Sequence, residues 1–192
     1  MGRMQTFDTD DAVRSARAVF WERGYEEASL PELERATGLS RSSIYHAFGN
    51  KRGLFDAAVA SYLREIIHPR LQPLEAAKVA PDALTNYFTG LREALSQPDS
   101  LQSHSGCLLL NAAGAPISNE TAVSQAIAGY REELKSALGR GAAALHPEMD
   151  DGARRQLATV LSSLVIAAMT LSRIDNAQAL ATLDTALALL QG

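Results

Sequence analysis

The stretch ATGLSRSSIYHAFGNK, residues 36–51, places a short helix between two glycines, Gly38 and Gly49. Ser40 has the side chain of a helix N-cap, and glycine is the residue that most often follows the end of a helix. A helix of about two turns does not form on intrinsic propensity alone. Ile44 and Phe48 are four residues apart and therefore share one side of the helix. The pattern predicts that this side packs on neighbouring helices and holds the short helix in place.

The opposite side of this short helix carries Arg41, Ser42, Tyr45 and His46, whose side chains can all form hydrogen bonds. Residues 35–55 contain basic residues and no acidic one, although the whole chain has a formal net charge of −4. Hydroxyl groups at a helix N-terminus and a guanidinium group suit phosphate oxygens and base edges in the major groove. The pattern favours DNA binding. The alternative is a polar face that meets only solvent.

The residues around the short helix predict three further helices. The first ends at Gly24, and the second opens with a capping box at Ser29 and ends at Gly38. The fourth begins at Lys51 and is expected to stop at Pro69, because proline has no N–H group to donate within a helix. Two short helices joined by a tight turn are typical of a helix-turn-helix unit.

Strand-forming residues are scarce in the remaining chain, whereas alanine and leucine are abundant, which favours helix. Breaks at Pro, Gly, Asp and Asn delimit expected helices at residues 81–97, 101–113, 118–140, 151–173 and 176–190. We therefore expect an all-α fold of about nine helices. A three-helix helix-turn-helix domain would occupy residues 1–52, joined through the fourth helix to a larger helical domain at 53–192.

The segment 12–54 resembles the TetR family of bacterial transcriptional regulators. The resemblance is carried by the run AVFWERGYEEASLPELERATGLSRSSIYHAFGNKRGLF, which matches the family pattern at Phe20, Gly24, Tyr25, Ser29, Leu33, Ala36, Gly38, Leu39, Ser40, Ile44, Tyr45, Phe48, Asn50, Lys51 and Leu54. It implies an N-terminal DNA-binding domain and a C-terminal domain for effector binding and dimerisation. The function implied is that of a repressor which a small effector releases from DNA.

The resemblance also implies roles for individual residues. The expected DNA-binding residues are Ser29, Ser40, Arg41, Ser42, Ser43, Tyr45, His46, Lys51 and Arg52. Arg41 is the candidate for a base contact, while Tyr45 and Lys51 would meet the DNA backbone. Ala28 and Ala47 depart from the family habit of a threonine and of His, Tyr or Arg. These departures suggest weaker backbone affinity, or compensation by His46 and Arg52.

Two C-terminal helices carry broad apolar stripes, more than one small domain can cover. The resemblance implies that they form a four-helix bundle across the axis of a homodimer, which would bind a palindromic operator on double-stranded DNA. The candidate interface residues are Leu157, Leu161, Leu164, Ala168, Leu180, Leu183 and Leu187. The alternative is that both helices fill the core of a single chain.

The middle helices would enclose an apolar pocket for a small-molecule effector of unknown identity. Candidate lining residues are Tyr62, Tyr87, Phe88, Leu91, Cys107, Leu108, Asn111, Tyr130 and Met169. Aromatic and leucine residues at helical spacing also occur in an ordinary hydrophobic core, which is the alternative interpretation.

The segment HSGCLLLNAAG, residues 104–114, resembles a motif found in a subset of the family and holds the only cysteine. In one interpretation Cys107 is a small buried side chain. In the other it is a redox- or electrophile-sensing thiol, left accessible by Gly106 and with its pKa lowered near a helix N-terminus. A remote alternative is a thiol enzyme that uses Cys107 and His104.

Several other functional classes find little support in the residues. The four histidines, His46, His68, His104 and His146, are scattered without the spacing of metal ligands, so we expect no metal and no cofactor. No catalytic residue is expected. The uncharged residues 157–172 are too few to span a bilayer. The N-terminus has no apolar signal-peptide core, so we expect a cytoplasmic protein without a membrane partner.

Overall fold

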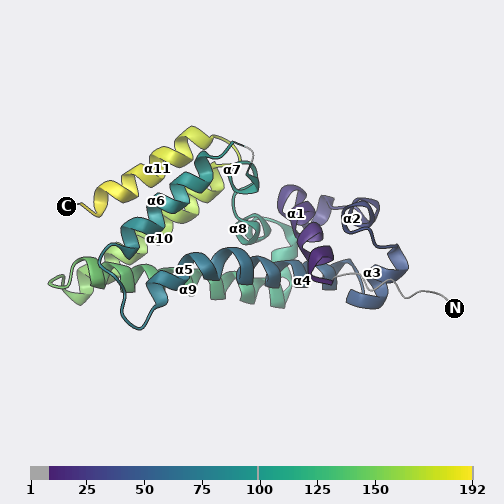
Figure 1. Cartoon of the computed structure of the whole chain (residues 1–192), viewed down its shortest axis with the longest axis horizontal. Coiled ribbons are helices and arrows are strands. Elements are labelled where there is room, and N and C mark those ends of the chain that lie inside the picture. The colour runs from purple at the N-terminus through teal and green to yellow at the C-terminus, as the bar shows by residue number, and fades with distance from the viewer. Residues whose placement is uncertain (1–8, 99, 192) are drawn as a thin grey trace.

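The computed structural model describes residues 9–98 and 100–191, and these residues form helices and no strand, which confirms the all-α class. The N-terminal part consists of α1 (Thr9–Glu27), α2 (Leu30–Thr37) and α3 (Arg41–Phe48), followed by α4 (Lys51–Tyr62), the π-helical turn η1 (Leu63–Ile67) and α5 (His68–Glu75). The remaining elements are α6 (Ala83–Ser96), α7 (Leu101–Ser105), α8 (Leu108–Ala113), the 3-10 turn η2 (Pro116–Asn119), α9 (Thr121–Leu145), α10 (Asp151–Leu171) and α11 (Asn176–Leu189). The molecule is elongated, with α1, α2 and α3 at one end and α6, α10 and α11 packed at the other (Figure 1).

The helix-turn-helix unit has the caps that its sequence predicts. Ser29 and Glu32 form a reciprocal capping box at the start of α2, and Gly38 ends this helix with a positive φ of 68°. The Ser40 side chain accepts a hydrogen bond from the backbone N–H of residue 43 at the start of α3. Ile44 is fully buried, and Phe48 is half-buried against the same hydrophobic core. These contacts confirm that α3 is held from its inner side.

The helix that follows does not stop at Pro69, contrary to the expectation. α4, η1 and α5 form one uninterrupted helical path over residues 51–75, with a second proline, Pro73, inside α5. The π-helical turn directly before α5 changes the hydrogen-bond register, and Pro69 lies in the first turn of α5, where its missing N–H group costs little. This path connects the helix-turn-helix unit to the C-terminal helices.

Two other expected helices have different bounds. The expected helix at 101–113 is broken at Gly106, whose φ of 63° and ψ of −123° suit only glycine, and α8 starts after Cys107. The expected helix at 118–140 starts at Thr121 and continues to Leu145. Gly141 lies inside this helix, and a Cβ there would lie 2.7 Å from a Leu74 methyl carbon. The glycine allows α5 to pack closely on α9.

One hydrophobic core extends through both parts of the chain. The ring of Phe20 on α1 packs edge-on against Phe55 on α4, with centroids 5.1 Å apart, and Trp21 packs in the same way against Tyr62 at 4.9 Å. The boundary expected between residues 52 and 53 therefore falls inside α4, which packs along α1. Separate domains at 1–52 and 53–192 remain a prediction.

Candidate nucleic-acid interface and inner cavity

The outer face of α3 is exposed as its sequence predicts. Arg41, Ser42 and His46 are exposed, and Tyr45 is 39% exposed although it is a large aromatic residue. The guanidinium carbon of Arg41 lies 5.4 Å from the centroid of the Tyr45 ring, a distance at which a cation and an aromatic ring attract each other. These side chains form a surface with hydrogen-bond donors and acceptors that faces away from the core.

Glu34 on α2 belongs to the same surface, although the sequence did not indicate it. Its carboxylate accepts a hydrogen bond from the backbone N–H of Arg41, and it borders a hollow of about 500 Å³. The hollow is lined by Glu34, Ser40, Arg41, Ser42 and Tyr45. The carboxylate stabilises the first turn of α3 and offers an acceptor to the amino group of a cytosine or adenine. No local motif marks this role, because Glu34 and Arg41 meet only through the turn between the two helices.

Two further expected DNA-binding residues lie at the starts of helices: Lys51 is the first residue of α4, and Ser29 is the N-cap of α2. The Lys51 ammonium lies 4.5 Å from the centroid of the Tyr25 ring and donates to the backbone carbonyl of Glu26 at 3.4 Å. Partial burial lowers the pKa of Lys51. Ser29 is exposed, and its hydroxyl contacts the Glu32 carboxylate at 2.8 Å. Ser40 and Ser43 hydrogen-bond to each other through their side-chain oxygens at 2.9 Å.

Arg52 forms two ion pairs that the sequence did not predict. Its guanidinium pairs with Asp56 at 2.9 Å and with Glu120 at 3.1 Å, and the side chain is only 21% exposed. Glu120 immediately precedes α9. Arg52 therefore forms a contact between α4 and the start of α9, and its two carboxylate partners would compete with a phosphate. A DNA contact by Arg52 stays a prediction.

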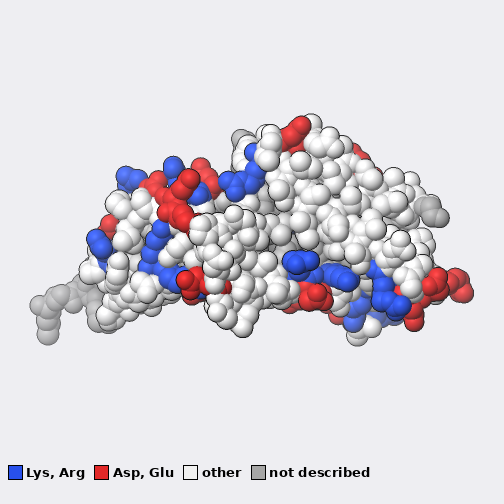
Figure 2. All heavy atoms as spheres, turned by 180° about the vertical axis from the view of Figure 1, so that it is seen from behind, with Lys and Arg blue, Asp and Glu red and all other residues white. Residues whose placement is uncertain are grey.

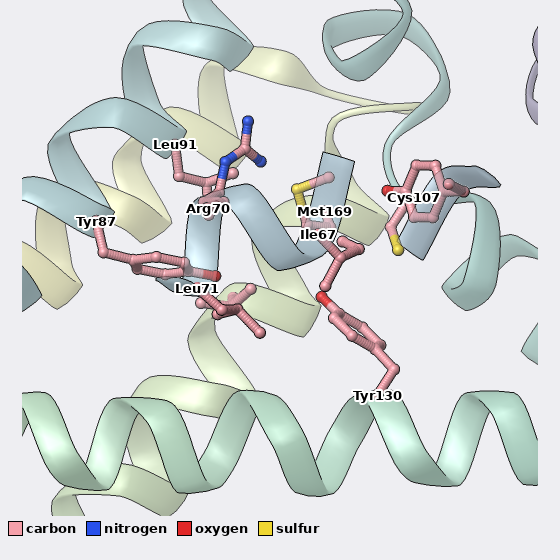
Figure 3. A pocket seen from close by; sticks show the side chains of 10 residues that line it. Ile67, Arg70, Leu71, Tyr87, Leu91, Cys107, Tyr130 and Met169 are labelled. Atoms are coloured by element: carbon pink, nitrogen blue, oxygen red, sulfur yellow. The ribbon is translucent and has the colours of Figure 1, made fainter. Parts of the chain in front are cut away.

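A small cavity lies between the middle helices (Figure 3). Its volume of about 10 Å³ is room for roughly one water molecule. The lining residues are Tyr62, Ile67, Arg70, Leu71, Tyr87, Leu91, Cys107, Tyr130, Val165 and Met169. Tyr87 and Tyr130 enter from opposite sides, and their hydroxyl groups point toward the middle (Figure 3).

Six of the nine expected pocket residues line the cavity. Tyr62, Tyr87, Leu91, Cys107, Tyr130 and Met169 line it. Phe88, Leu108 and Asn111 do not line it: the first two are buried elsewhere, and the Asn111 amide donates to the carbonyl of Ser105. Their part in an effector pocket stays a prediction. Four other lining residues were not expected from the sequence, namely Ile67, Arg70, Leu71 and Val165. Arg70 is the one Lys, Arg, Asp or Glu residue between Glu65 and Glu75, and this was the one signal available.

Cys107 is buried, with 1% of its surface exposed. Burial raises the pKa of its thiol, and hydrogen bonds from Tyr62, from the backbone of α8 and from Tyr130 oppose this rise. The expectation of an accessible thiol with a lowered pKa is wrong, because Gly106 packs against the carbonyl of Met169 and does not leave an opening. His104 is exposed and does not line this cavity, which removes the basis for a Cys107/His104 catalytic pair.

The expected dimer interface is also partly misplaced. Leu161, Ala168 and Leu183 have no exposed surface to offer a partner chain, because they fill the core between the C-terminal helices. Leu157, Leu164, Leu180 and Leu187 are half-buried. The exposed large apolar residues of this region are Val160, Ile174 and Leu189. The periodicity identified the apolar helices but not the side of each that faces outward.

Two further findings concern the residues that the structure describes. None of their helices has the length and apolar character needed to cross a lipid bilayer. Within the same part of the chain, no three His, Cys, Asp or Glu side chains come together as possible metal ligands.

Comparisons with known proteins agree with this architecture. A family model described as bacterial regulatory proteins of the tetR family matches residues 12–58. The uncharacterized HTH-type transcriptional regulator YezE of Bacillus subtilis (strain 168) is 32% identical over 141 residues, which cover 73% of this chain and 71% of YezE. The HTH-type transcriptional repressor ComR of Escherichia coli (strain K12) is 34% identical over 111 residues, covering 57% of this chain and 51% of ComR.

Solved structures show the same fold along nearly the whole chain. A cysteine-substituted variant of the TetR family transcriptional regulator CifR, complexed with a 26-base-pair double-strand operator DNA, superposes with a TM-score of 0.77. It is 32% identical, and the match covers 97% of this chain and 98% of CifR. The reduced form of E. coli NemR has a TM-score of 0.74 at 19% identity, over 94% of this chain and 95% of NemR, which shows the fold alone.

Proposed function

The chain belongs to the TetR family of transcriptional regulators, and from this membership we propose that it is a repressor which binds a palindromic operator as a homodimer and is released by a small effector. The observation that carries the proposal is the exposed polar face of α3, held from behind by the buried Ile44. The side chains of Arg41 and Tyr45 on this face suit base edges and phosphate oxygens.

The surface composition of the C-terminal helices supports the proposal of a homodimer. Residues 156–171 of α10 contain no charged residue, and Asp184 is the one charged residue of α11. Seen from behind, the molecule has a broad area without charged side chains over this end (Figure 2). Val160 on α10 and Leu189 on α11 are exposed at 39% and 45%. Such a surface is suited to a second copy of the chain, which would bring two α3 helices to successive major grooves.

Binding of the protein to the DNA upstream of its own gene tests the proposal. We expect a specific complex with two chains per site in a gel-shift titration, competed by the same fragment and not by a scrambled one. A mass measurement on the free protein should give a dimer. Equal affinity for the scrambled fragment, or one chain per site, would contradict the proposal.

Three contacts are available to connect an effector to the DNA-binding end. The indole N–H of Trp21 donates to the carbonyl of Gly106 at 3.0 Å, and the Glu26 carboxylate accepts from the backbone N–H of Ile117 at 2.9 Å. The third is the ion pair of Arg52 with Glu120. Gly106 directly precedes Cys107, which lines the cavity. We propose that a ligand in the cavity shifts this turn and thereby α1, which changes the spacing of the two α3 helices.

A sensing role for Cys107 is the second candidate, because the thiol lines the same cavity next to two tyrosine hydroxyls. Because the thiol is buried, a reagent reaches it only when the helices around the cavity open locally. We therefore expect a small alkylating reagent to release the DNA slowly, and the Cys107→Ser variant to resist release. Because burial raises the thiol pKa, the rate of modification should keep rising with pH beyond the ordinary pKa of cysteine. Release from the Cys107→Ser variant at the wild-type rate would rule this role out.

Regulation of this kind requires no catalytic residue, and Cys107 and His104 lie in different environments. We therefore propose no enzymatic activity. Because the proposed partner is chromosomal DNA, we propose a cytoplasmic location.

A further inference from the structure

A second and larger hollow lies directly outside the small cavity. It has a volume of about 690 Å³ and runs between α5 and α6, from Ile66 and Pro69 to Asn86 and Gly90. Arg70 and Tyr87 line both hollows. These two side chains therefore form the partition between the outer groove and the inner cavity.

The positive charge of Arg70 has no acidic partner among the described residues. A guanidinium nitrogen of Arg70 donates a hydrogen bond to the amide oxygen of Gln102 on α7, at 3.2 Å. A half-buried guanidinium normally pairs with a carboxylate, and a neutral amide satisfies only one of its five N–H groups. Two other arginines of the chain do pair with carboxylates, Arg17 with Glu65 and Arg92 with Asp184.

The inner cavity offers hydrogen-bond donors and no anion of its own. None of its lining residues is acidic, and Tyr62, Tyr87 and Tyr130 bring hydroxyl groups to it. Burial raises the pKa of all three phenols, and the charge of Arg70 opposes this rise at each of them. The three phenols therefore stay protonated and lie within the electrostatic influence of Arg70. An anion in the cavity would meet the Arg70 cation and neutral hydroxyl donors.

We propose that the effector is a small organic carboxylate with an apolar body, which enters through the groove between α5 and α6 and pairs with Arg70. This inference rests on the proposed function, because it names the ligand class of the same regulatory site. The planar guanidinium binds a carboxylate through two parallel hydrogen bonds. The apolar body would lie among Leu91, Val165 and Met169.

A carboxylate fits better than a phosphate ester or a cation. A phosphate dianion would need more than one close cation, and the inner cavity contains only Arg70, while the outer groove holds Lys78 together with the opposite charge of Asp82. A ligand cation would be repelled by Arg70. Because the inner cavity now has room for about one water, Arg70 and Tyr87 must move apart on binding. The hydrogen bond to neutral Gln102 permits such a movement.

The test compares acids with their neutral amides on the full-length protein. The probes are benzoate with benzamide, phenylacetate with phenylacetamide, and butyrate with butyramide, each up to about 10 mM, well above a Kd of about 1 mM that corresponds to weak binding. We expect at least one acid to raise the thermal midpoint and to weaken operator binding, and its amide to do neither. Equal effects of an acid and its amide, or no effect of any acid, would overturn the inference.

Variants of Arg70 identify the site. Arg70→Gln should bind the active acid about 10- to 100-fold more weakly, the range for removal of a hydrogen bond to a charged group. Arg70→Lys should keep part of the affinity, because it retains the charge without the bidentate geometry. Arg64→Gln is the matched control, since Arg64 lies on the same helical path, is exposed and lines neither hollow. Unchanged acid binding by Arg70→Gln would also overturn the inference.

Failure of this inference is distinguishable from failure of the proposed function. Operator binding by the free protein tests the function and does not involve Arg70. If Arg70→Gln retains operator affinity and its thermal midpoint without ligand, weaker acid binding reports on the site and not on folding.

Discussion

Replacing Gly106 with alanine is expected to lower the free energy of unfolding by roughly 2–5 kcal/mol, from a backbone conformation that only glycine adopts well and from overpacking. The residue has φ 63° and ψ −123°, and a Cβ would lie 2.1 Å from the carbonyl oxygen of Met169. The turn would have to move away from α10. Its carbonyl would then no longer meet the indole N–H of Trp21, which lies 3.0 Å away in the wild type.

The measurement is chemical unfolding monitored by circular dichroism, together with operator affinity. Gly129→Ala is the matched control, because Gly129 lies inside α9 and an added Cβ there meets nothing within 4 Å. Alanine should stabilise that helix by about 0.5–1 kcal/mol. If Gly106→Ala were as stable as this control, the close contact between the turn and α10 would be disproved.

Removing the Arg41 side chain is expected to change which operator the protein prefers, whereas removing that of Lys51 should weaken all operators alike. A base contact accounts for about 1–3 kcal/mol of discrimination at one position, so Arg41→Ala should flatten the preference at one base pair in each half-site. Lys51 lies at the N-terminus of α4, where an ammonium can meet a phosphate. Lys51→Ala should reduce the slope of log affinity against log salt by about 0.9 for each phosphate that the lysine neutralises.

Fluorescence anisotropy with a set of single-base operator variants, repeated at several salt concentrations, separates these effects. Lys135→Ala is the control, because it removes one positive charge on α9, far along the chain from α3. It should alter neither the preference nor the slope by a comparable amount. An unchanged base preference in Arg41→Ala would remove Arg41 from the base-reading role.

Some features of this protein were predictable because they depend on nearby residues. Ser29, Ser40 and Asn50 each cap the helix that follows, and Gly38 ends α2, as the spacing of the residues indicates. The burial of Ile44 and the exposure of Arg41 follow from their positions on opposite sides of one short helix. The similarity to known regulators depends on the same local signals, and the family was therefore recognisable from residues 12–54.

Two predicted helix ends were wrong, because the structure around each residue outweighs its local signal. Pro69 was expected to stop a helix, but the π-helical turn before it accommodates the missing N–H group. Gly141 does not break α9, and its lack of a side chain lets Leu74 approach this helix. The helix thus continues past Pro69 through a local change of hydrogen-bond register, and past Gly141 with close packing of α5 on α9.

The sequence by itself determined the all-helical class, the helix-turn-helix unit and the polar face of α3, since hydrogen bonds and side-chain periodicity within a few residues specify them. Only the tertiary structure decided that Cys107 is buried, that Arg52 pairs with Glu120 and that Arg70 borders a cavity without an acidic partner among the described residues. The charge state and reactivity of such groups depend on neighbours that lie far away in the chain. Those neighbours are specified only when the helices pack against one another.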